Sequence, residues 1–212
     1  MRILNEESNV KAPYDFAVEN VVATVTIKIP ERINLPALAK EYIDSEYNPE
    51  RFPGLIMRIE NPKATILIFS TGRMVITGMR RAEEAEPVVD KVIKRMKKAK
   101  INVSDPQIII QNIVASGHLH KNIDLNKAAV LFESAMYEPE VFPGLIYRMR
   151  EPRTVFLIFS TGRIVCTGVR TKELAEAAVI KLAKEIEEFG VIMDESEKET
   201  GEFNEEEDLE FI

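Results

Sequence analysis

Few side chains in this sequence have the types and spacing that covalent chemistry needs. His118 and His120 can share one face of a strand, but no third ligand at a suitable spacing accompanies them, which favours an exposed pair over a metal site. Cys166, in the apolar run IVCTG, is predicted to be a core residue and not a nucleophile. The two STGR sequences lack the lysine and the long glycine loop of a phosphate-binding nucleotide motif. The sequence therefore predicts no catalytic residue, no metal ion and no cofactor.

A different kind of chemistry is indicated by the heptapeptide LIFSTGR, which occupies residues 67–73 and again residues 157–163. Each copy ends an apolar run with a phenylalanine, passes through a turn and finishes on an arginine. Because the same heptapeptide occurs twice, we next compare the segments that surround the two copies.

Internal duplication organises the chain. Residues 52–85 align without a gap on residues 142–175, at a constant shift of 90, with about 20 identities in 34 positions. The similarity extends towards the N-terminus, where NVVATV at 20–25 matches NIVASG at 112–117 with a shift of 92. We therefore expect two repeats with a common plan.

Each repeat is predicted to contain the same series of elements. An apolar strand (18–29 or 108–117) leads to a short helix whose first turn is capped by Asn34 or Asp124. Three short runs of β type follow, and the turns between them are short enough to require antiparallel pairing. A longer amphipathic helix closes each repeat, over residues 81–98 and 172–188. The fold class is therefore α+β.

The predicted strands are apolar on both faces. In TILIF, Ile66 and Ile68 face one way while Leu67 and Phe69 face the other, and residues 155–159 repeat this pattern. Two helices per repeat suffice to cover one face, so the second face is expected to meet a partner. Packing of the two repeats sheet against sheet, as a sandwich, remains an alternative at this point.

Charge is distributed unevenly along the chain. The 212 residues carry a formal charge of −7, but residues 194–212 hold ten acids and one lysine, a net of −9. Subtracting −9 from −7 leaves about +2 on residues 1–193. The composition of the tail predicts disorder. We divide the chain into an N-terminal extension (1–13), a first repeat (14–103), a second repeat (104–193) and the acidic tail (194–212).

The start of the chain, MRILNEESNVKAP, lacks the pattern of a signal peptide, and no apolar run approaches the length of a membrane span. One cysteine excludes an internal disulfide. These observations predict a soluble intracellular protein with no membrane partner.

The order of the motifs identifies a family resemblance. NVVATV, EYNPERFPGLIMRI and NPKATILIFSTGRMVITG in the first repeat, with QNIVASG, YEPEVFPGLIYRM and EPRTVFLIFSTGRIVCTG in the second, resemble the TATA-box-binding proteins, and the near-equal repeats are similar to the archaeal members. The resemblance covers about residues 14–190. It implies one continuous, curved antiparallel sheet shaped as a saddle, with helices on the convex side and DNA beneath. It also implies a general transcription initiation factor located in the cytoplasm, associated with the nucleoid.

The resemblance assigns DNA contacts to both repeats. It implies that apolar residues face the minor groove of A·T-rich promoter DNA, that two asparagines donate to base acceptors near the centre of the site, and that paired phenylalanines wedge into base steps at its ends. Arginines and threonines beside the strands are expected to contact phosphates. The expected DNA-binding residues are Asn20, Val22, Phe52, Arg58, Leu67, Phe69, Thr71, Arg73, Val75 and Thr77 in the first repeat, and Asn112, Val114, Phe142, Arg148, Leu157, Phe159, Thr161, Arg163, Val165 and Thr167 in the second.

Taken singly, each of these residues has a less specific interpretation, because most phenylalanines are core and most arginines after a turn are solvated. The alternation of Phe69 and Phe159 with Ile68 and Ile158 argues otherwise, since one helical layer cannot bury both members of each pair. We therefore expect the two phenylalanine rings to lie on the face away from the helices.

Protein partners are expected on one repeat in particular. Glu138 and Glu140 match an acidic loop through which the family contacts the B-type initiation factor, and RNA polymerase follows through the initiation complex. The counterpart loop in the first repeat, NPERF at 48–52, is less acidic. A homodimer in the absence of DNA, a protein-interaction module with an open apolar sheet, and a small-molecule enzyme with a site between the repeats remain alternatives. The basic stretch 91–100 and the acidic tail have no assigned role.

Overall fold

One ten-stranded antiparallel sheet forms the framework of the protein, in a computed structural model that describes residues 14–193. The strand order is β2-β3-β4-β5-β1-β6-β10-β9-β8-β7, so the two repeats join edge to edge in one sheet. The sandwich alternative is therefore wrong. The strands are β1 (Asp15–Lys28), β2 (Ser45–Glu46), β3 (Leu55–Glu60), β4 (Lys63–Ile68), β5 (Arg73–Met79), β6 (Ser104–His118), β7 (Ala135–Met136), β8 (Leu145–Met149), β9 (Thr154–Ile158) and β10 (Arg163–Val169).

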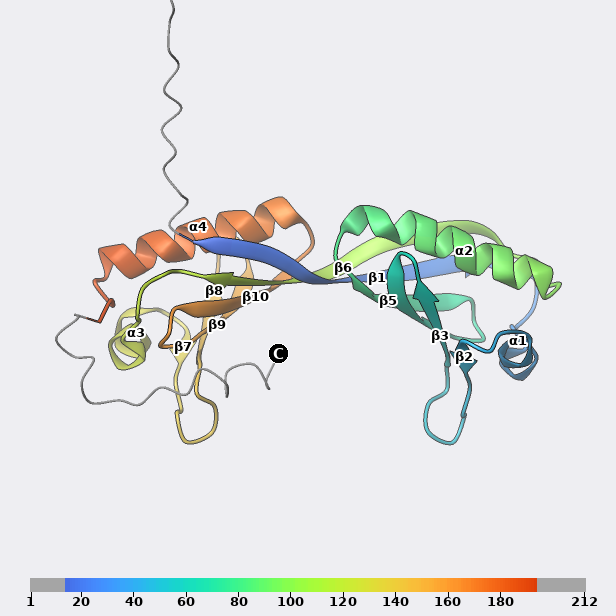
Figure 1. Cartoon of the computed structure of the whole chain (residues 1–212), viewed down its shortest axis with the longest axis horizontal. Coiled ribbons are helices and arrows are strands. Elements are labelled where there is room, and N and C mark those ends of the chain that lie inside the picture. Colours follow the sequence, from blue (N-terminus) through green and yellow to red (C-terminus); the bar gives the residue numbers. More distant parts are fainter. Residues whose placement is uncertain (1–13, 194–212) are drawn as a thin grey trace, which may run out of the picture.

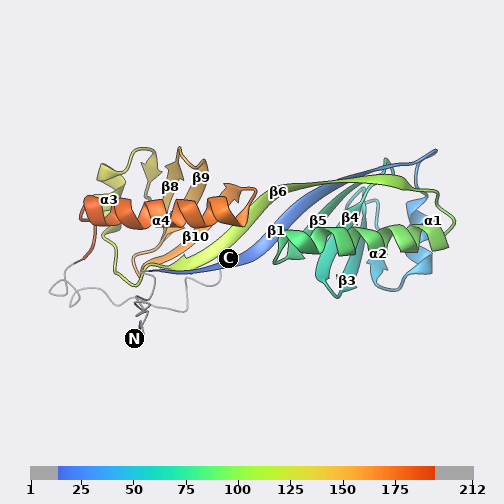
Figure 2. The same cartoon turned by 90° about the horizontal axis from the view of Figure 1, so that it is seen from above.

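The two longest strands, β1 and β6, hold the repeats together. They pair antiparallel from Asp15 opposite His118 to Lys28 opposite Ser104, and each reaches from one repeat into the other (Figures 1 and 2). Both are longer than the sequence predicts, chiefly at their N-terminal ends, because those segments gain ladder partners from the other repeat. The register shifts near Val18, Val22 and Thr26, and such bulges increase the local twist of a sheet. The sheet arches as a saddle in Figure 1.

Helices cover only the convex side of the saddle. The long helices α2 (Ala85–Lys98) and α4 (Lys172–Glu188) lie along that side, and the short helices α1 (Leu35–Glu41) and α3 (Leu125–Leu131) lie at its two ends (Figures 1 and 2). Val88, Val92 and Met96 of α2 are fully buried. Burying each such side chain stabilises the fold by about 1.5–3 kcal/mol. The α+β class with one curved sheet is confirmed.

The helix starts agree with the sequence in three places and differ in one. The side chains of Asn34 and Asp124 accept hydrogen bonds from the backbone N–H of Ala37 (3.0 Å) and Lys127 (2.9 Å), as expected for caps. Helix α4 begins at Lys172 as expected, but α2 begins at Ala85, after a 3₁₀ turn over Ala82–Glu84. Pro87 explains the difference, because it has no N–H to close an α-helical turn onto residue 83.

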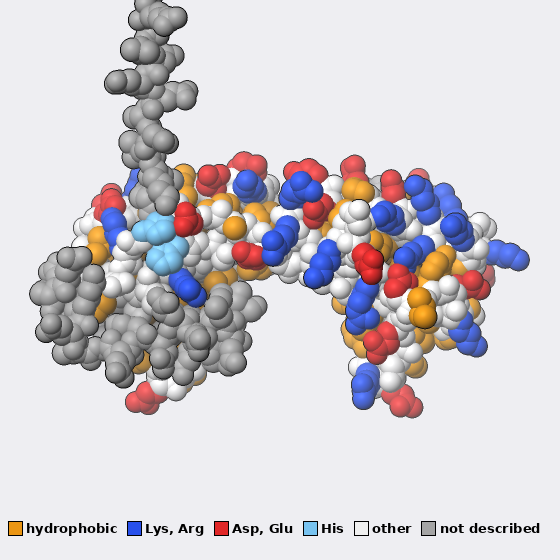
Figure 3. Space-filling view, viewed as in Figure 1, with side chains coloured by type: hydrophobic (Ala, Val, Ile, Leu, Met, Phe, Trp, Pro, Cys, Tyr) orange, Lys and Arg blue, Asp and Glu red, His pale blue; other side chains and the backbone are white. Residues whose placement is uncertain are grey.

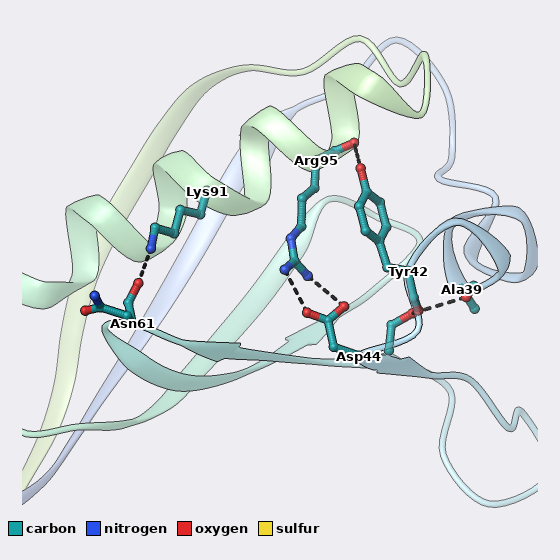
Figure 4. Close-up of polar contacts among 7 residues, drawn as sticks. Ala39, Tyr42, Asp44, Asn61, Lys91 and Arg95 are labelled. Carbon is teal, nitrogen blue, oxygen red and sulfur yellow. Dashed lines mark hydrogen bonds and ion pairs between the residues drawn. The ribbon is translucent and has the colours of Figure 1, made fainter.

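The basic stretch 91–100 forms the end of α2, and part of it serves the fold. Arg95 forms an ion pair with Asp44 at 2.7 Å, and the Tyr42 hydroxyl donates to the Arg95 carbonyl at 2.8 Å (Figure 4). Lys91 donates to the carbonyl of Asn61 in the same view. In the second repeat, Glu185 occupies the position of Arg95 and accepts from the Tyr147 hydroxyl at 2.9 Å. Lys181 donates to the carbonyl of Glu151 at 2.7 Å, so the lysine contact recurs in the second repeat, whereas the contacts of Arg95 do not.

Candidate nucleic-acid interface

The sheet face that points away from α2 and α4, here called the concave face, is apolar and largely uncovered by other described elements. Along β4, Ile66 and Ile68 are fully buried towards the helices, whereas Leu67 on the opposite side is half-buried. Val22, Val75 and Val114 are likewise half-buried, and Val165 is 8% exposed. This alternation puts the apolar residues that the resemblance assigns to the groove on one continuous face.

Two equivalent asparagine clusters lie near the middle of the concave face. The Oδ1 atom of Asn20 accepts from the backbone N–H of Gly78 at 2.8 Å, and the Thr77 hydroxyl lies 3.1 Å from its Nδ2 atom. Gly78 has φ of 87°, a conformation that glycine adopts without a Cβ penalty. Because a backbone N–H can only donate, its contact identifies the Oδ1 atom and leaves the amide group to serve as donor.

The second repeat reproduces this cluster with the same three residue types. Asn112 accepts from the N–H of Gly168 at 2.9 Å, and its Nδ2 atom lies 2.9 Å from the Thr167 hydroxyl. Each asparagine therefore holds a fixed orientation before any ligand binds. Both amide groups retain one N–H that is not needed by the threonine.

The four expected wedge residues form two ring pairs. Phe52 and Phe69 meet edge to face with ring centroids 5.7 Å apart, and Phe142 and Phe159 do so at 5.9 Å. Glycines 54 and 144 lie under these rings, where an added Cβ would approach Phe52 or Phe142 to less than 3 Å. The pairs thus require glycine in each PGL segment.

The burial of the two ring pairs differs. Phe52, Phe69 and Phe142 are half-buried, whereas Phe159 is only 2% exposed and neighbours the fully buried Ile158. The burial of Phe159 is on the side of the strand opposite Ile158, so it does not come from the layer of helices that covers Ile158.

The expected phosphate contacts flank the apolar region. Arg58, Arg73 and Arg148 are exposed, and Arg163 is half-buried beside His118 on the neighbouring strand. Arg58 approaches Glu46 only at 4.0 Å, so it remains available to a ligand. Thr71 is exposed, and the Thr161 hydroxyl is buried without a hydrogen-bond partner among the described residues.

Two histidines and an acid occur at the rim of this face in the second repeat. The His118 and His120 rings stack at 4.8 Å, and His120 Nε2 lies 3.0 Å from an Asp15 carboxylate oxygen. Burial, and then the charges of His120 and Arg163, lower the pKa of His118 below its ordinary value of 6.5, while Asp15 opposes this shift. His118 is half-buried, so the expectation of an exposed pair is met only by His120. The sequence did not predict Asp15, because β1 and β6 are neighbours in the sheet although these residues are far apart in the chain.

The expected partner-binding glutamates lie on the loop that follows β7. Glu138 and Glu140 are exposed, and the Glu138 carbonyl accepts from the N–H of Phe142 at 3.0 Å. Asn48 makes the same bond to Phe52 at 2.9 Å in the first repeat. Each loop projects from one end of the saddle in Figure 1. Through these backbone bonds, each loop also positions a wedge phenylalanine. Charged side chains occupy the tips of both projections in Figure 3.

Three other features of residues 14–193 bear on the sequence predictions. Cys166 is buried, and desolvation raises the pKa of its thiol to about 12. No cluster of histidine, cysteine and carboxylate side chains within this range is arranged to hold a metal ion. None of the helices in the same range is long and apolar enough to cross a membrane.

Comparison with known proteins gives concordant results. The profile of the family described as transcription factor TFIID, or TATA-binding protein, matches residues 15–99 and 107–189. A TATA-box-binding protein of Pyrobaculum aerophilum is 46% identical over 193 residues, covering 90% of this chain and 96% of the relative. One of Aeropyrum pernix is 47% identical over 177 residues, covering 83% and 86%. The solved structure of the Methanococcus jannaschii TBP superposes with a TM-score of 0.74 at 40% identity, covering 82% of this chain and 99% of that one.

Proposed function

The chain belongs to the TATA-binding-protein family, whose members are non-enzymatic general transcription factors that bind TATA DNA, and we propose that it does so through the minor groove, bending the duplex. We further propose that the bent complex recruits a B-type initiation factor and, through it, RNA polymerase. The two repeats, taken as residues 14–103 and 104–193, are proposed to bind one half of the site each.

The two oriented asparagines carry the proposal for the minor groove. The floor of that groove presents only acceptors at A·T pairs, and G·C pairs add the guanine amino donor. The free N–H groups of Asn20 and Asn112 complement those acceptors, and the valines beside them offer nothing to a guanine amino group. Burying an unpaired donor costs about 1–3 kcal/mol, which is enough to select A·T pairs.

The ring pairs support the proposal for bending. Apolar wedges unstack a base step and kink the duplex, a mechanism for which TATA-binding proteins are themselves a standard example. One pair lies in each repeat, so one kink is expected at each end of the site. The flanking arginines then meet phosphates, and each contact adds to the salt dependence of binding.

The exposed Glu138 and Glu140 are the proposed contact with the B-type factor, because the first repeat has Asn48 in place of Glu138. A pseudo-symmetric saddle needs such a difference to direct assembly to one side. Without DNA, the apolar concave face is a candidate for self-association. Sedimentation across a concentration series tests that point.

A gel-shift titration tests the DNA proposal most directly. Binding to an A·T-rich octamer is compared with binding to a G·C-substituted duplex at one fixed salt concentration. We expect a clear preference for the A·T-rich duplex. Equal affinity would contradict minor-groove readout and favour a protein-interaction module.

A further inference from the structure

Glu19 and Gln111 occupy equivalent bulges on the two central strands. Glu19 lies where the β1–β6 register shifts between Val18 and Asn20, and Gln111 lies where it shifts between Asn112 and Ile110. Each residue immediately precedes one of the two central asparagines. A bulge re-aims the side chain of its extra residue, and these two side chains turn towards hydroxyls on the concave face.

The two bulge residues make the same hydrogen bond with opposite polarity. The Ser116 hydroxyl donates to Glu19 Oε1 at 2.7 Å, whereas Gln111 Nε2 donates to the Thr24 hydroxyl at 2.7 Å. Ser116 pairs with Val165 on β10, and Thr24 pairs with Val75 on β5. Ser116 and Thr24 therefore occupy equivalent positions in the two repeats. The concave face thus carries a carboxylate at one position and its isosteric amide at the other.

The neighbouring arginines leave this difference at one charge and shift both sides towards positive charge. Arg80 Nη2 lies 3.6 Å from Glu19 Oε2, and both side chains are partly exposed. Arg170, the counterpart of Arg80, has no carboxylate within 4.0 Å among residues 14–193. The glutamate side therefore has a local charge of zero, and the glutamine side has a local charge of +1.

A charge difference of this kind distinguishes the halves of an asymmetric DNA site. A-tracts have a narrow minor groove with an enhanced negative potential, whereas TA steps are flexible and easily kinked. A carboxylate next to the groove disfavours the more negative half, and an amide does not. The duplex should therefore place its A-tract half away from Glu19.

We propose that Glu19 is a specificity-determining residue that orients this protein on A·T-rich DNA, directing the second repeat, where Ser116 holds Glu19, to the half with alternating TA steps. The inference rests on the proposed DNA-binding function. It requires only the charge of Glu19, since glutamine at this position can still accept from Ser116 through its carbonyl oxygen.

Fluorescence energy transfer measures the orientation. A donor dye is attached to an added cysteine in Glu50→Cys, an exposed site in the first repeat, while the buried Cys166 thiol stays unreactive. The acceptor is placed at either end of a duplex that has one alternating TA half and one A-tract half. The ratio of transfer from the two ends gives the orientation ratio, and a fully alternating duplex, whose two orientations are identical, serves as the control.

Three substitutions separate charge from structure. Glu19→Gln should move the orientation ratio towards one by about threefold, the size expected for one partly screened charge. Gln111→Glu should also reduce the bias and weaken binding. The double swap Glu19→Gln/Gln111→Glu keeps the net charge and should reverse the preferred orientation, with thermal unfolding unchanged within a few degrees.

The orienting role would be overturned if the wild-type protein gave an orientation ratio of one. It would also be overturned if the wild-type ratio persisted in both Glu19→Gln and the double swap. Failure of the proposed function looks different, because the wild-type protein would then bind A·T-rich and G·C-rich duplexes equally in the first titration.

Discussion

Replacing Asn112 by aspartate tests whether the central asparagines read base acceptors. The retained Oδ1 atom can still accept from the N–H of Gly168, now at 2.9 Å, and the new oxygen can accept from the Thr167 hydroxyl that lies beside Nδ2. The internal bonds of the folded protein therefore survive. What changes is the group that faces DNA, from an N–H donor to an anionic acceptor.

The expected loss follows from that change. Burying an acceptor against another acceptor costs about 1–3 kcal/mol of binding free energy, and more when the acceptor is charged. Affinity for an A·T-rich octamer should therefore fall roughly 10- to 100-fold. A central G·C pair presents an amino donor that aspartate can accept. The preference for A·T over G·C at that position should therefore narrow in the variant.

Fluorescence anisotropy with two duplexes that differ in one central base pair measures both effects at fixed salt. Asn126→Asp adds the same charge on the exposed surface of α3, away from the concave face, and serves as the control. Wild-type affinity in Asn112→Asp, or an equal loss in Asn126→Asp, would refute direct reading by Asn112. An unchanged A·T preference would refute the donor argument specifically.

Three further predictions concern the wedge, the partner loop and pH. Phe69→Ala should reduce the bend measured by end-to-end energy transfer with little change in thermal stability, because the ring is half-buried, whereas Phe156→Ala in the core should cost about 3–5 kcal/mol of unfolding free energy. Glu140→Arg should leave DNA affinity unchanged and impair the ternary complex with the B-type factor in a supershift assay, while the equivalent Glu50→Arg should form it normally. The pKa of His118 is lowered in the folded protein, so the unfolded chain binds a proton at this residue more readily. Stability measured by urea unfolding should therefore decrease as the pH falls below about 6.5, and it should decrease less in His118→Gln. A pH-independent difference in stability between the two proteins would contradict this.

Local chemistry in the sequence was sufficient for much of this structure. The duplication, the two caps at Asn34 and Asp124, and the two-faced strands each follow from residues close together in the chain. The strand that contains Leu67 has apolar residues on both of its faces. This pattern already implied that something other than helices must cover one of the two faces. The family resemblance then supplied the residues that are proposed to face the DNA.

Contacts between distant segments required the tertiary structure. Asn20 meets Thr77 and Glu19 meets Ser116 only because the bulges in β1 and β6 set the register between strands, and no local pattern reports the position of a bulge. The pairing of Asp15 with His120 likewise joins residues that are far apart in the sequence. The sequence by itself determined two matching halves with an uncovered apolar face. Tertiary structure decided how the halves differ, because electrostatic asymmetry depends on which side chains the register brings within a few ångströms of each other.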